Sequence, residues 1–317
     1  ADDCIEITVF PNDTVGLLAE FQIDPDVDYI TVINSVCTTA EDSGSQISLE
    51  RDLTGSVVSI RGSISYRSEP VQLWVSIHGP SEFFLTIFKD ILEAHGVDLA
   101  GSTRYVAAAQ PNDPTYKILL THASPPLRNL ICITNQHSQN LYAELLLRIL
   151  GAELIRRQYP RDDSNSTLLS NLPNNAFEVG RKSVQEWEAR MAGNSTGFAM
   201  VDGSGLSRRN LISASGLIKV LVHMNRSPYA TDFINSLATP GVGTLKNRFA
   251  GLPKGITMYA KTGSLVRVRS LSGYLCEHDE PRIAFSIICN NFLCSASEVE
   301  QTINNLCHML ALYLKED

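Results

Sequence analysis

Residues 256–288 read ITMYAKTGSLVRVRSLSGYLCEHDEPRIAFSII, and within them apolar and polar residues alternate in three runs. The runs cover Ile256–Ala260, Leu265–Tyr274 and Arg282–Ile288. Alternation with a period of two is typical of strands that bury one face, and short connections suit antiparallel neighbours. This stretch therefore predicts three adjacent antiparallel strands.

Helical patterns flank these strands. Leu141–Leu150 has its apolar residues in helical register and is expected to end at Gly151, and a second helix is expected over Val179–Met191. A capping-box pattern from Ser297 to Glu300 opens a C-terminal helix. Its expected apolar face consists of Val299, Ile303, Leu306, Leu310 and Leu314. The pattern predicts an α+β domain in which helices flank an antiparallel sheet.

The first hundred residues have a different pattern. Short alternating runs at Ile5–Val9, Val57–Ile64 and Val71–Val75 predict a small β-rich module. One amphipathic helix follows, capped by Ser81 and ended by Gly96. Its expected apolar face consists of Phe84, Ile87, Phe88, Ile91 and Leu92.

The Pro- and Asp-bearing stretch 110–114 is the expected domain boundary. It divides the chain into a β-rich domain over residues 1–110 and a mixed domain over residues 111–317. Within the second domain, a short strand is expected at Phe198–Val201 and a polar surface loop at 162–175.

Composition limits the function classes. The chain has 317 residues, of which 44% are hydrophobic and 19% charged, enough for a sizeable core. A net charge of −8 argues against nucleic acid as a partner, because a phosphate backbone requires clustered Lys and Arg. No apolar run is long enough for a transmembrane segment, and the polar start of the chain is not a signal peptide.

The cysteine pattern gives little support to a metal site. The seven cysteines are spread along the chain and form no C-x-x-C pair. One alternative is a metal cluster formed by Cys289, Cys294, Cys307 and His308, but buried, inert thiols are the favoured interpretation. No cofactor and no metal are expected, and the histidines lack the H-E-x-x-H pattern of metallohydrolases.

Two short motifs indicate chemistry. Lys261-Thr262-Gly263-Ser264 places a cation and two hydroxyls along a strand, which suits a substrate carboxylate, although a solvated lysine beside a turn glycine is the simpler alternative. Ser138-Gln139-Asn140 precedes a helix, where a plain N-cap is the alternative. Together, Ser-x-Asn and a downstream Lys-Thr-Gly match part of the motif set of penicillin-recognising serine acyl-transferases.

Further segments extend this match, and the chain resembles the type-4 penicillin-binding proteins, the class C low-molecular-mass D-alanyl-D-alanine carboxypeptidases and endopeptidases. The resemblance covers essentially the whole chain and is most specific from Ser138 to Asn290. The segments that carry it are Ser138–Gly151, Asp202–Asn210, Gly243–Arg248, Ala260–Leu265 and Leu271–Tyr274.

This resemblance implies a penicillin-recognising, β-lactamase-like α+β fold with a smaller β-rich inserted domain. It also implies a serine-type peptidase that acts through an acyl-enzyme on peptidoglycan stem peptides, that reacts with β-lactams, and that works outside the cytoplasm, in the periplasm or at the cell wall. The resemblance leaves open whether the protein forms homo-oligomers.

The same resemblance implies roles for individual residues. Ser138 would relay a proton to the leaving amine, and Asn140 would hydrogen-bond the substrate amide and help to hold the catalytic lysine. The backbone N–H of Ser264 would form half of the oxyanion hole. The expected substrate-binding residues are Lys261, Thr262, Gly263 and Ser264.

One part of the family pattern is missing. The family's nucleophile is the serine of a Ser-x-x-Lys motif, and no lysine of this chain has a serine three residues before it. Thr86 before Lys89 is the only hydroxyl at that spacing, and it falls within the predicted helix that follows Ser81. We therefore expect the chain to be the C-terminal part of a longer protein whose missing N-terminal segment, the expected partner, carries the nucleophile.

Two alternatives remain open. The first is a catalytically inactive peptidoglycan-binding or structural fragment that retains the substrate cleft. The second is an α/β-hydrolase, because Gly193–Gly197 fits G-x-S-x-G and Asp232 with His278 or His308 follows in order. That motif needs a strand before its serine and a helix after it, and here the predicted order is reversed.

A further motif, Asp202-Gly203-Ser204-Gly205, predicts a tight turn. We expect Asp202 to pair with Arg208 and to brace the floor of the site, which is a structural role rather than a catalytic one.

Overall fold

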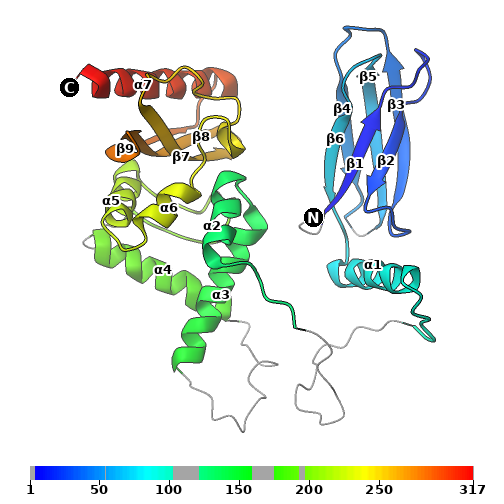
Figure 1. Ribbon diagram of the computed structural model, residues 1–317, viewed down its shortest axis with the longest axis horizontal. Coiled ribbons are helices and arrows are strands. Elements are labelled where there is room, and N and C mark those ends of the chain that lie inside the picture. Colours follow the sequence, from blue (N-terminus) through cyan, green and yellow to red (C-terminus); the bar gives the residue numbers. More distant parts are fainter. Residues whose placement is uncertain (1–3, 54, 103–120, 159–174, 193–196, 317) are drawn as a thin grey trace. The chain divides into compact units, whose positions relative to one another are not determined.

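The computed structural model describes residues 4–53, 55–102, 121–158, 175–192 and 197–316. They belong to two compact units, one within residues 1–109 and one within 110–317 (Figure 1). The expected linker at 110–114 and nearly all of the expected loop at 162–175 lie outside the described residues.

The first unit is a sandwich of two three-stranded sheets. One sheet, with the order β2-β1-β6 and antiparallel neighbours, consists of β1 (Cys4–Phe10), β2 (Glu20–Asp24) and β6 (Val71–Ser76). The other sheet, with the order β3-β5-β4 and a parallel β3–β5 pair, consists of β3 (Thr31–Thr39), β4 (Gln46–Arg51) and β5 (Val57–Ser65). The three alternating runs of this region are thus confirmed as strands.

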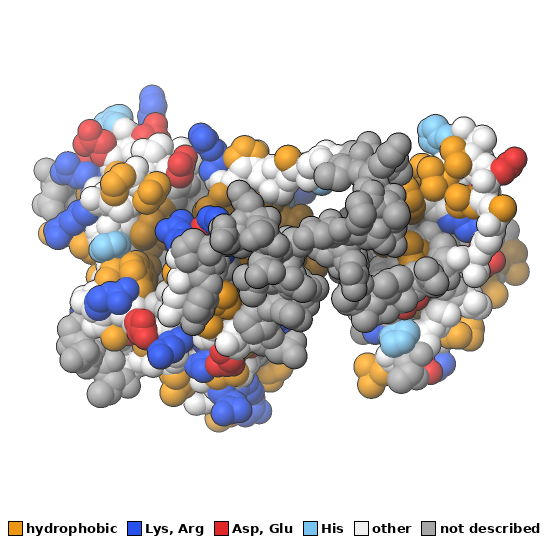
Figure 2. Space-filling view, turned by 90° about the horizontal axis from the view of Figure 1, so that it is seen from below, with side chains coloured by type: hydrophobic (Ala, Val, Ile, Leu, Met, Phe, Trp, Pro, Cys, Tyr) orange, Lys and Arg blue, Asp and Glu red, His pale blue; other side chains and the backbone are white. Residues whose placement is uncertain are grey.

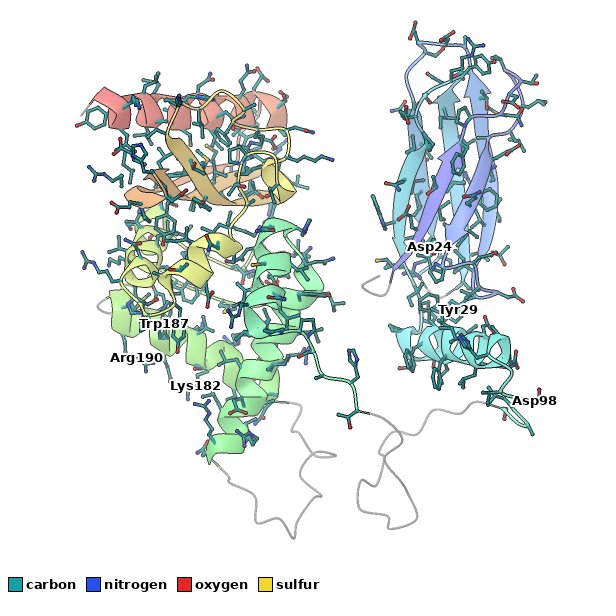
Figure 3. The ribbon with its side chains drawn as sticks, in the orientation of Figure 1. Asp24, Tyr29, Asp98, Lys182, Trp187 and Arg190 are labelled. Atoms are coloured by element: carbon teal, nitrogen blue, oxygen red, sulfur yellow. The ribbon has the colours of Figure 1, made fainter. Side chains whose placement is uncertain are left out.

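Inward-facing side chains of both sheets form the core of this unit. Its fully buried members include Ile5, Ile7, Val9, Val36, Val58, Ile60 and Ile64. Helix α1 (Pro80–Ala94) adds Phe83 to this core. Tyr29 anchors the start of α1, because its hydroxyl donates to the carbonyls of His78 and Gly79 and its ring meets Phe83 edge-on with centroids 5.1 Å apart (Figure 3).

Helix α1 differs from expectation in its start and in its buried face. It begins directly after Gly79, whose backbone is left-handed (φ 66°), so Ser81 lies in the first turn and is not the cap. Phe83 is buried, whereas Phe84 is 64% exposed and stacks on Phe88 with ring centroids 5.8 Å apart. Apolar residues surround much of this helix, so spacing alone did not identify the side that packs.

The second unit contains the three strands that the opening sequence predicts. They are β7 (Ile256–Leu265), β8 (Val268–Glu277) and β9 (Glu280–Asn290), antiparallel in the order β7-β8-β9. The boundary between the first two differs from expectation, because Leu265 ends β7 and the turn follows at Val266 and Arg267.

Helices cover both faces of this sheet (Figure 1). Helix α7 (Ala296–Glu316) packs on one face, and α5 (Ala214–Asn225) and α6 (Ala230–Ser236) pack on the other. The α7 side of the core includes Met258, Leu271, Leu275, Val299, Ile303, Cys307 and Ala311. On the other side, the buried hydroxyl of Tyr274 donates to the carbonyl of Leu221 at 2.6 Å, and burial raises the pKa of Tyr274.

Three more helices complete the unit: α2 (Leu127–Gln136), α3 (Asn140–Gln158) and α4 (Ala176–Ala192). Helix α3 continues through Gly151, which sequence analysis took as its end. A Cβ atom at Gly151 would clash with the carbonyl of Ala176, so this glycine serves the close crossing of α3 and α4. The expected strand at Phe198–Val201 is reduced to one bridge between Ala199 and Leu211.

The capping box of α7 lies two residues earlier than predicted. Ser295 Oγ accepts from the N–H of Glu298 at 3.2 Å, and the Glu298 carboxylate accepts from the N–H of Ser295 at 2.8 Å. Glu300 instead accepts from Arg269 at 2.8 Å, which ties α7 to the sheet. Leu306 is 44% exposed, and its neighbour Cys307 takes the core position.

Within the described residues, no helix combines the length and the apolar character needed to cross a bilayer, and no three His, Cys, Asp or Glu side chains gather as a metal site.

Burial raises the pKa of the Cys276 and Cys307 thiols to about 12 and about 11. Cys294 is exposed, so the expectation of a buried thiol is wrong at that position. On the face shown in Figure 2, charges of both signs are interspersed with hydrophobic side chains.

Replacing Gly273 with alanine should destabilise the second unit. A Cβ atom at this β8 position would collide with the carbonyl oxygen of Tyr259 on β7, so the two strands would have to separate. We expect Gly273→Ala to reduce the free energy of unfolding by roughly 1–3 kcal/mol, measured by thermal or urea unfolding. Gly197→Ala is the matched control, because that site is open and should change stability by less than about 0.5 kcal/mol. Equal effects of the two substitutions would contradict this account.

Candidate active site

The two motifs that sequence analysis singled out meet through one hydrogen bond. Lys261 Nζ donates to Ser138 Oγ at 2.7 Å, across 123 residues of sequence. It also donates to the carbonyl of its neighbour Thr262 at 2.9 Å. The structure therefore brings together the serine of Ser-x-Asn and the lysine of Lys-Thr-Gly.

Ser138 lies in the short connection between α2 and α3 and has a left-handed backbone (φ 56°). The carbonyl of the next residue, Gln139, accepts the first bond of α3 from the N–H of Ala143 at 3.2 Å. Gln139 is thus the N-terminal cap, and the Ser138 hydroxyl is used for contact with Lys261. The N-cap alternative for Ser138 is wrong.

Contacts to α6 hold this connection in place. The side chain of Asn135, near the end of α2, donates to Ser236 Oγ at 2.8 Å, and that of Gln136 donates to the carbonyl of Asn235 at 3.2 Å. Two residues after Ser236, Ala238 pairs with Ala260, the β7 residue just before Lys261. The segment 235–238 therefore contacts both halves of the site.

Lys261 is partly removed from water, and among the described residues its amine bonds to neutral oxygens only. Burial disfavours the ammonium and lowers the pKa of Lys261 from 10.5 to about 8. An amine in this range can both bind an anion and give up a proton near neutral pH.

A row of hydroxyls lies beside Lys261 on the same face of the sheet. Ser272 of β8 is directly opposite Lys261, and its Oγ is 2.9 Å from the Oγ of Ser286 on β9. Gly263 faces Ser270, whose hydroxyl occupies the space of a side chain at 263. Sequence analysis gave no role to Ser272, although it lies in the matching segment Leu271–Tyr274, and did not single out Ser286, because their position beside Lys261 depends on strand register.

β7 is an edge strand, and in the described structure its outer edge pairs with other backbone at a single bridge, between Ala260 and Ala238. Ala260 exchanges both main-chain hydrogen bonds with Ala238, at 2.9 and 3.1 Å, so its N–H and C=O point outward. In a strand this direction repeats every second residue, so the N–H groups of Thr262 and Ser264 also point to the outer edge. Ser264 is exposed there.

The remaining candidate, Asn140, is the first residue of α3 and has an exposed side chain. It lies two residues from Ser138, but it is not among the described hydrogen-bond partners of Lys261. Its expected contact with the catalytic lysine of Ser-x-x-Lys involves a residue outside this sequence.

Glu144 is a further residue that sequence analysis did not assign. One oxygen of its carboxylate accepts from the N–H groups of Gly203 and Ser204, each at 3.0 Å. Helix α3, which follows Ser138, is thereby joined to the glycine-containing turn. Glu144 lies within Ser138–Gly151, one of the segments that carry the family resemblance, so the sequence did contain an indication of its importance.

The turn that Glu144 binds is organised by Asp202. Its carboxylate accepts from the N–H groups of Gly205 and Ser207, both at 2.7 Å, and from the side chain of Asn210 at 2.8 Å. Arg208 is not among these partners in the described structure, so the predicted Asp202–Arg208 pair is wrong. Main-chain N–H groups close enough to the carboxylate took the place of the arginine.

The structure gives no support to an α/β-hydrolase triad. The glycine and serine of Gly193–Ser195 lie outside the described residues. Of the proposed partners, Asp232 lies in α6 and His308 in α7, and these helices cover opposite faces of the sheet.

Known proteins are similar to this chain over most of its length. The model of the D-Ala-D-Ala carboxypeptidase 3 (S13) family matches residues 1–312. The penicillin-sensitive carboxypeptidase A of Dictyostelium discoideum is 27% identical over 99% of this chain and 59% of its own length, and the D-alanyl-D-alanine carboxypeptidase of Actinomadura sp. (strain R39) is 25% identical over 90% and 50%.

Among solved structures, penicillin-binding protein 4 of Haemophilus influenzae, crystallised with a β-lactam, aligns with a TM-score of 0.62 and 22% identity. The alignment covers 98% of this chain and 69% of that one. The second unit therefore has the α+β fold of penicillin-recognising proteins. The chain belongs to the D-Ala-D-Ala carboxypeptidase 3 (S13) family, and it spans about half the length of the two carboxypeptidases above.

The titration of Lys261 is testable directly. Reaction of its amine with a trace of acylating reagent, followed by peptide mass spectrometry across pH, should show a midpoint near 8. Ser138→Ala removes an oxygen that stabilises the ammonium, so the midpoint should move lower still. Thr262→Val retains the carbonyl that Lys261 contacts and should leave the midpoint unchanged. A midpoint near 10.5 in the unmodified chain would show that the amine is fully hydrated.

Proposed function

We propose that this chain supplies the substrate-binding part of a serine-type D-Ala-D-Ala carboxypeptidase that acts on peptidoglycan stem peptides, with the nucleophilic Ser-x-x-Lys contributed from outside these 317 residues. The observation that carries the proposal is the hydrogen bond between Lys261 and Ser138 beside the open edge of β7. The family membership of the chain points to the same activity.

The first step is recognition of the terminal carboxylate. The ammonium of Lys261 provides the charge, and the hydroxyls of Thr262 and Ser264 provide donors on the same strand. Gly263 keeps this section of the strand free of a bulky side chain. The substrate is bound in an extended conformation along the outer edge of β7, where main-chain N–H groups are available.

The second step is acyl transfer. The external serine gives its proton to the lysine of its own Ser-x-x-Lys motif and attacks the carbonyl of the penultimate D-Ala. The bond to the terminal D-Ala nitrogen then breaks, and an acyl-enzyme forms. The N–H of Ser264 stabilises the oxyanion. Ser138 gives its proton to the leaving amine and takes one from Lys261, a transfer for which the 2.7 Å contact is suitable. The proton that the Ser-x-x-Lys lysine took from the nucleophile restores the ammonium of Lys261, so no net proton is lost. Water then hydrolyses the acyl-enzyme.

Asn140 has a binding role in this scheme. Its exposed amide at the start of α3 donates to, and accepts from, the substrate's backbone amide. The same arrangement accepts a D-amino-acid cross-link, so endopeptidase activity on cross-linked stem peptides belongs to the proposal.

β-Lactams are the expected inhibitors, because they present a carboxylate and a reactive carbonyl in place of the D-Ala-D-Ala end. One relative is named as penicillin-sensitive, and the Haemophilus structure contains a β-lactam. Since peptidoglycan lies outside the membrane, the proposed place of action is extracytoplasmic, in the periplasm or at the cell wall.

Intact-mass measurement with excess benzylpenicillin tests where the nucleophile lies. We expect the mass of this 317-residue chain to stay unchanged, because none of its lysines completes a Ser-x-x-Lys motif. The protein that includes the upstream coding region should gain one penicilloyl group. An adduct on the short chain would place the nucleophile within it, and no adduct on the longer protein would favour the inactive peptidoglycan-binding fragment.

The proposed carboxylate contact predicts a specific loss in the longer protein. Lys261→Met should reduce kcat/KM for a D-Ala-D-Ala peptide by about 100-fold, the effect of removing one partner of a close charge pair. The same peptide with a C-terminal amide lacks the charge, so Lys261→Met should slow its cleavage less than it slows cleavage of the acid. Lys246→Met, at an exposed position outside the site, is the control. If Lys261→Met prefers the acid peptide over the amide peptide by the same factor as the unmodified enzyme, Lys261 is not the carboxylate ligand.

A further inference from the structure

The outer face of the β2-β1-β6 sheet is mostly polar, although it also carries the half-buried Cys4 and Phe10. Side chains on this face alternate with the buried ones, so β1 presents Glu6 and Thr8 between the buried Ile5, Ile7 and Val9. The large hydrophobic side chain that is exposed on this face is Trp74 of β6, at 62%. Tryptophan combines a large apolar ring with an N–H donor and is enriched at interfaces, so an exposed Trp beside polar partners is a candidate for ligand contact.

Strand register places Trp74 in a row with two carboxylates. Glu6 lies directly opposite Trp74 on one side and directly opposite Asp24 on the other, so the row runs Asp24, Glu6, Trp74 across β2, β1 and β6. Asp24 is exposed at the end of β2 (Figure 3). A parallel row of polar side chains, from Gln22 through Thr8 to Gln72, lies next to it.

Hydrogen bonds fix the centre of this face. Glu6 Oε1 accepts from Gln72 Nε2 at 2.9 Å and from Thr8 Oγ1 at 3.1 Å. In the described structure both bonds use the same oxygen, which leaves Oε2 available to accept from a ligand. The carboxylate is therefore held in one orientation beside the indole ring.

This combination matches the chemistry of a sugar ring. A pyranose has an apolar face of C–H groups that packs flat on an indole, and a rim of hydroxyls that donate to carboxylates and amides in the plane of the ring. The acidic row disfavours an anionic polymer such as a nucleic acid. The polar neighbours of Trp74 also differ from the wide apolar face that membrane insertion requires.

We propose that the outer face of the β2-β1-β6 sheet, formed by Asp24, Glu6, Trp74 and Gln72, binds an uncharged β-1,4-linked N-acetylhexosamine chain. The indole stacks on one sugar ring, Glu6 Oε2 and Asp24 accept from hydroxyl or acetamido N–H groups, and Gln72 contacts an adjacent substituent. The choice of this glycan rests on the proposed function, since stem peptides are attached to such a chain; the site itself rests on the geometry of the sheet.

Fluorescence provides the test, because the chain has two tryptophans, Trp74 and Trp187. In a Trp187→Phe variant Trp74 is the single reporter, and titration with N,N′,N″,N‴-tetraacetylchitotetraose should change its emission to saturation. Trp74→Ala should weaken binding of the same oligosaccharide, measured by calorimetry, by roughly tenfold or more. Glu6→Gln keeps the size and one acceptor oxygen of the side chain and should weaken binding several-fold.

Phe84→Ala is the matched control, because Phe84 is a similarly exposed aromatic in the same unit but lies on α1. It should bind the oligosaccharide as the unmodified chain does. No saturable binding by the unmodified chain, or equal binding by Trp74→Ala, would overturn the proposal. Because the assay uses this chain without a nucleophile, failure of sugar binding is distinguishable from failure of penicillin acylation.

Discussion

The hydrogen bond between Lys261 and Ser138 depends on how the helices are attached to the sheet. Ser138 lies in the connection that follows α2, and the last residues of α2 are hydrogen-bonded to α6. Ala238, two residues after α6, pairs with Ala260 on the strand that carries Lys261. An error of one residue in that pairing would turn Lys261 to the opposite face of the sheet. The same packing that aligns the two groups also excludes water from the amine, so position and lowered pKa have one cause.

Much of the fold could be predicted from residues 256–288 and from the short alternating runs near the N-terminus, because period-two alternation directly reflects one buried face. The errors arose where tertiary contacts decide. Gly151 has the sequence signature of a helix end, yet it lies inside α3 because another helix crosses there. Ser295 and Ser297 each have a glutamate three residues later. In the structure Ser295 is the cap, whereas Ser297 lies in the first turn of α7 and its Glu300 pairs with Arg269.

The candidate site was predictable to the extent that it consists of motifs. Ser138 and Lys261 were identified by residue type and spacing, and the structure brings them into contact. Ser272 and Ser286 could not be identified in this way, since their position beside Lys261 follows from which residues face each other across three strands. Asp202 shows the opposite case: its partner was predicted from charge, but nearby main-chain N–H groups satisfy its carboxylate without an arginine.

An amine with a pKa of about 8 reconciles the two tasks proposed for Lys261. At pH 7 about nine in ten such amines are protonated, enough to bind a carboxylate. A bound carboxylate favours the ammonium and raises the pKa, so binding takes up a proton at higher pH and weakens as pH rises above about 8. A lysine of ordinary pKa would bind the anion equally well but would pass its proton to Ser138 less readily. Under the proposed function, partial burial with neutral oxygens as the only described partners would offset the rise in pKa caused by the carboxylate, so that one side chain could hold the substrate and supply the proton for the leaving amine.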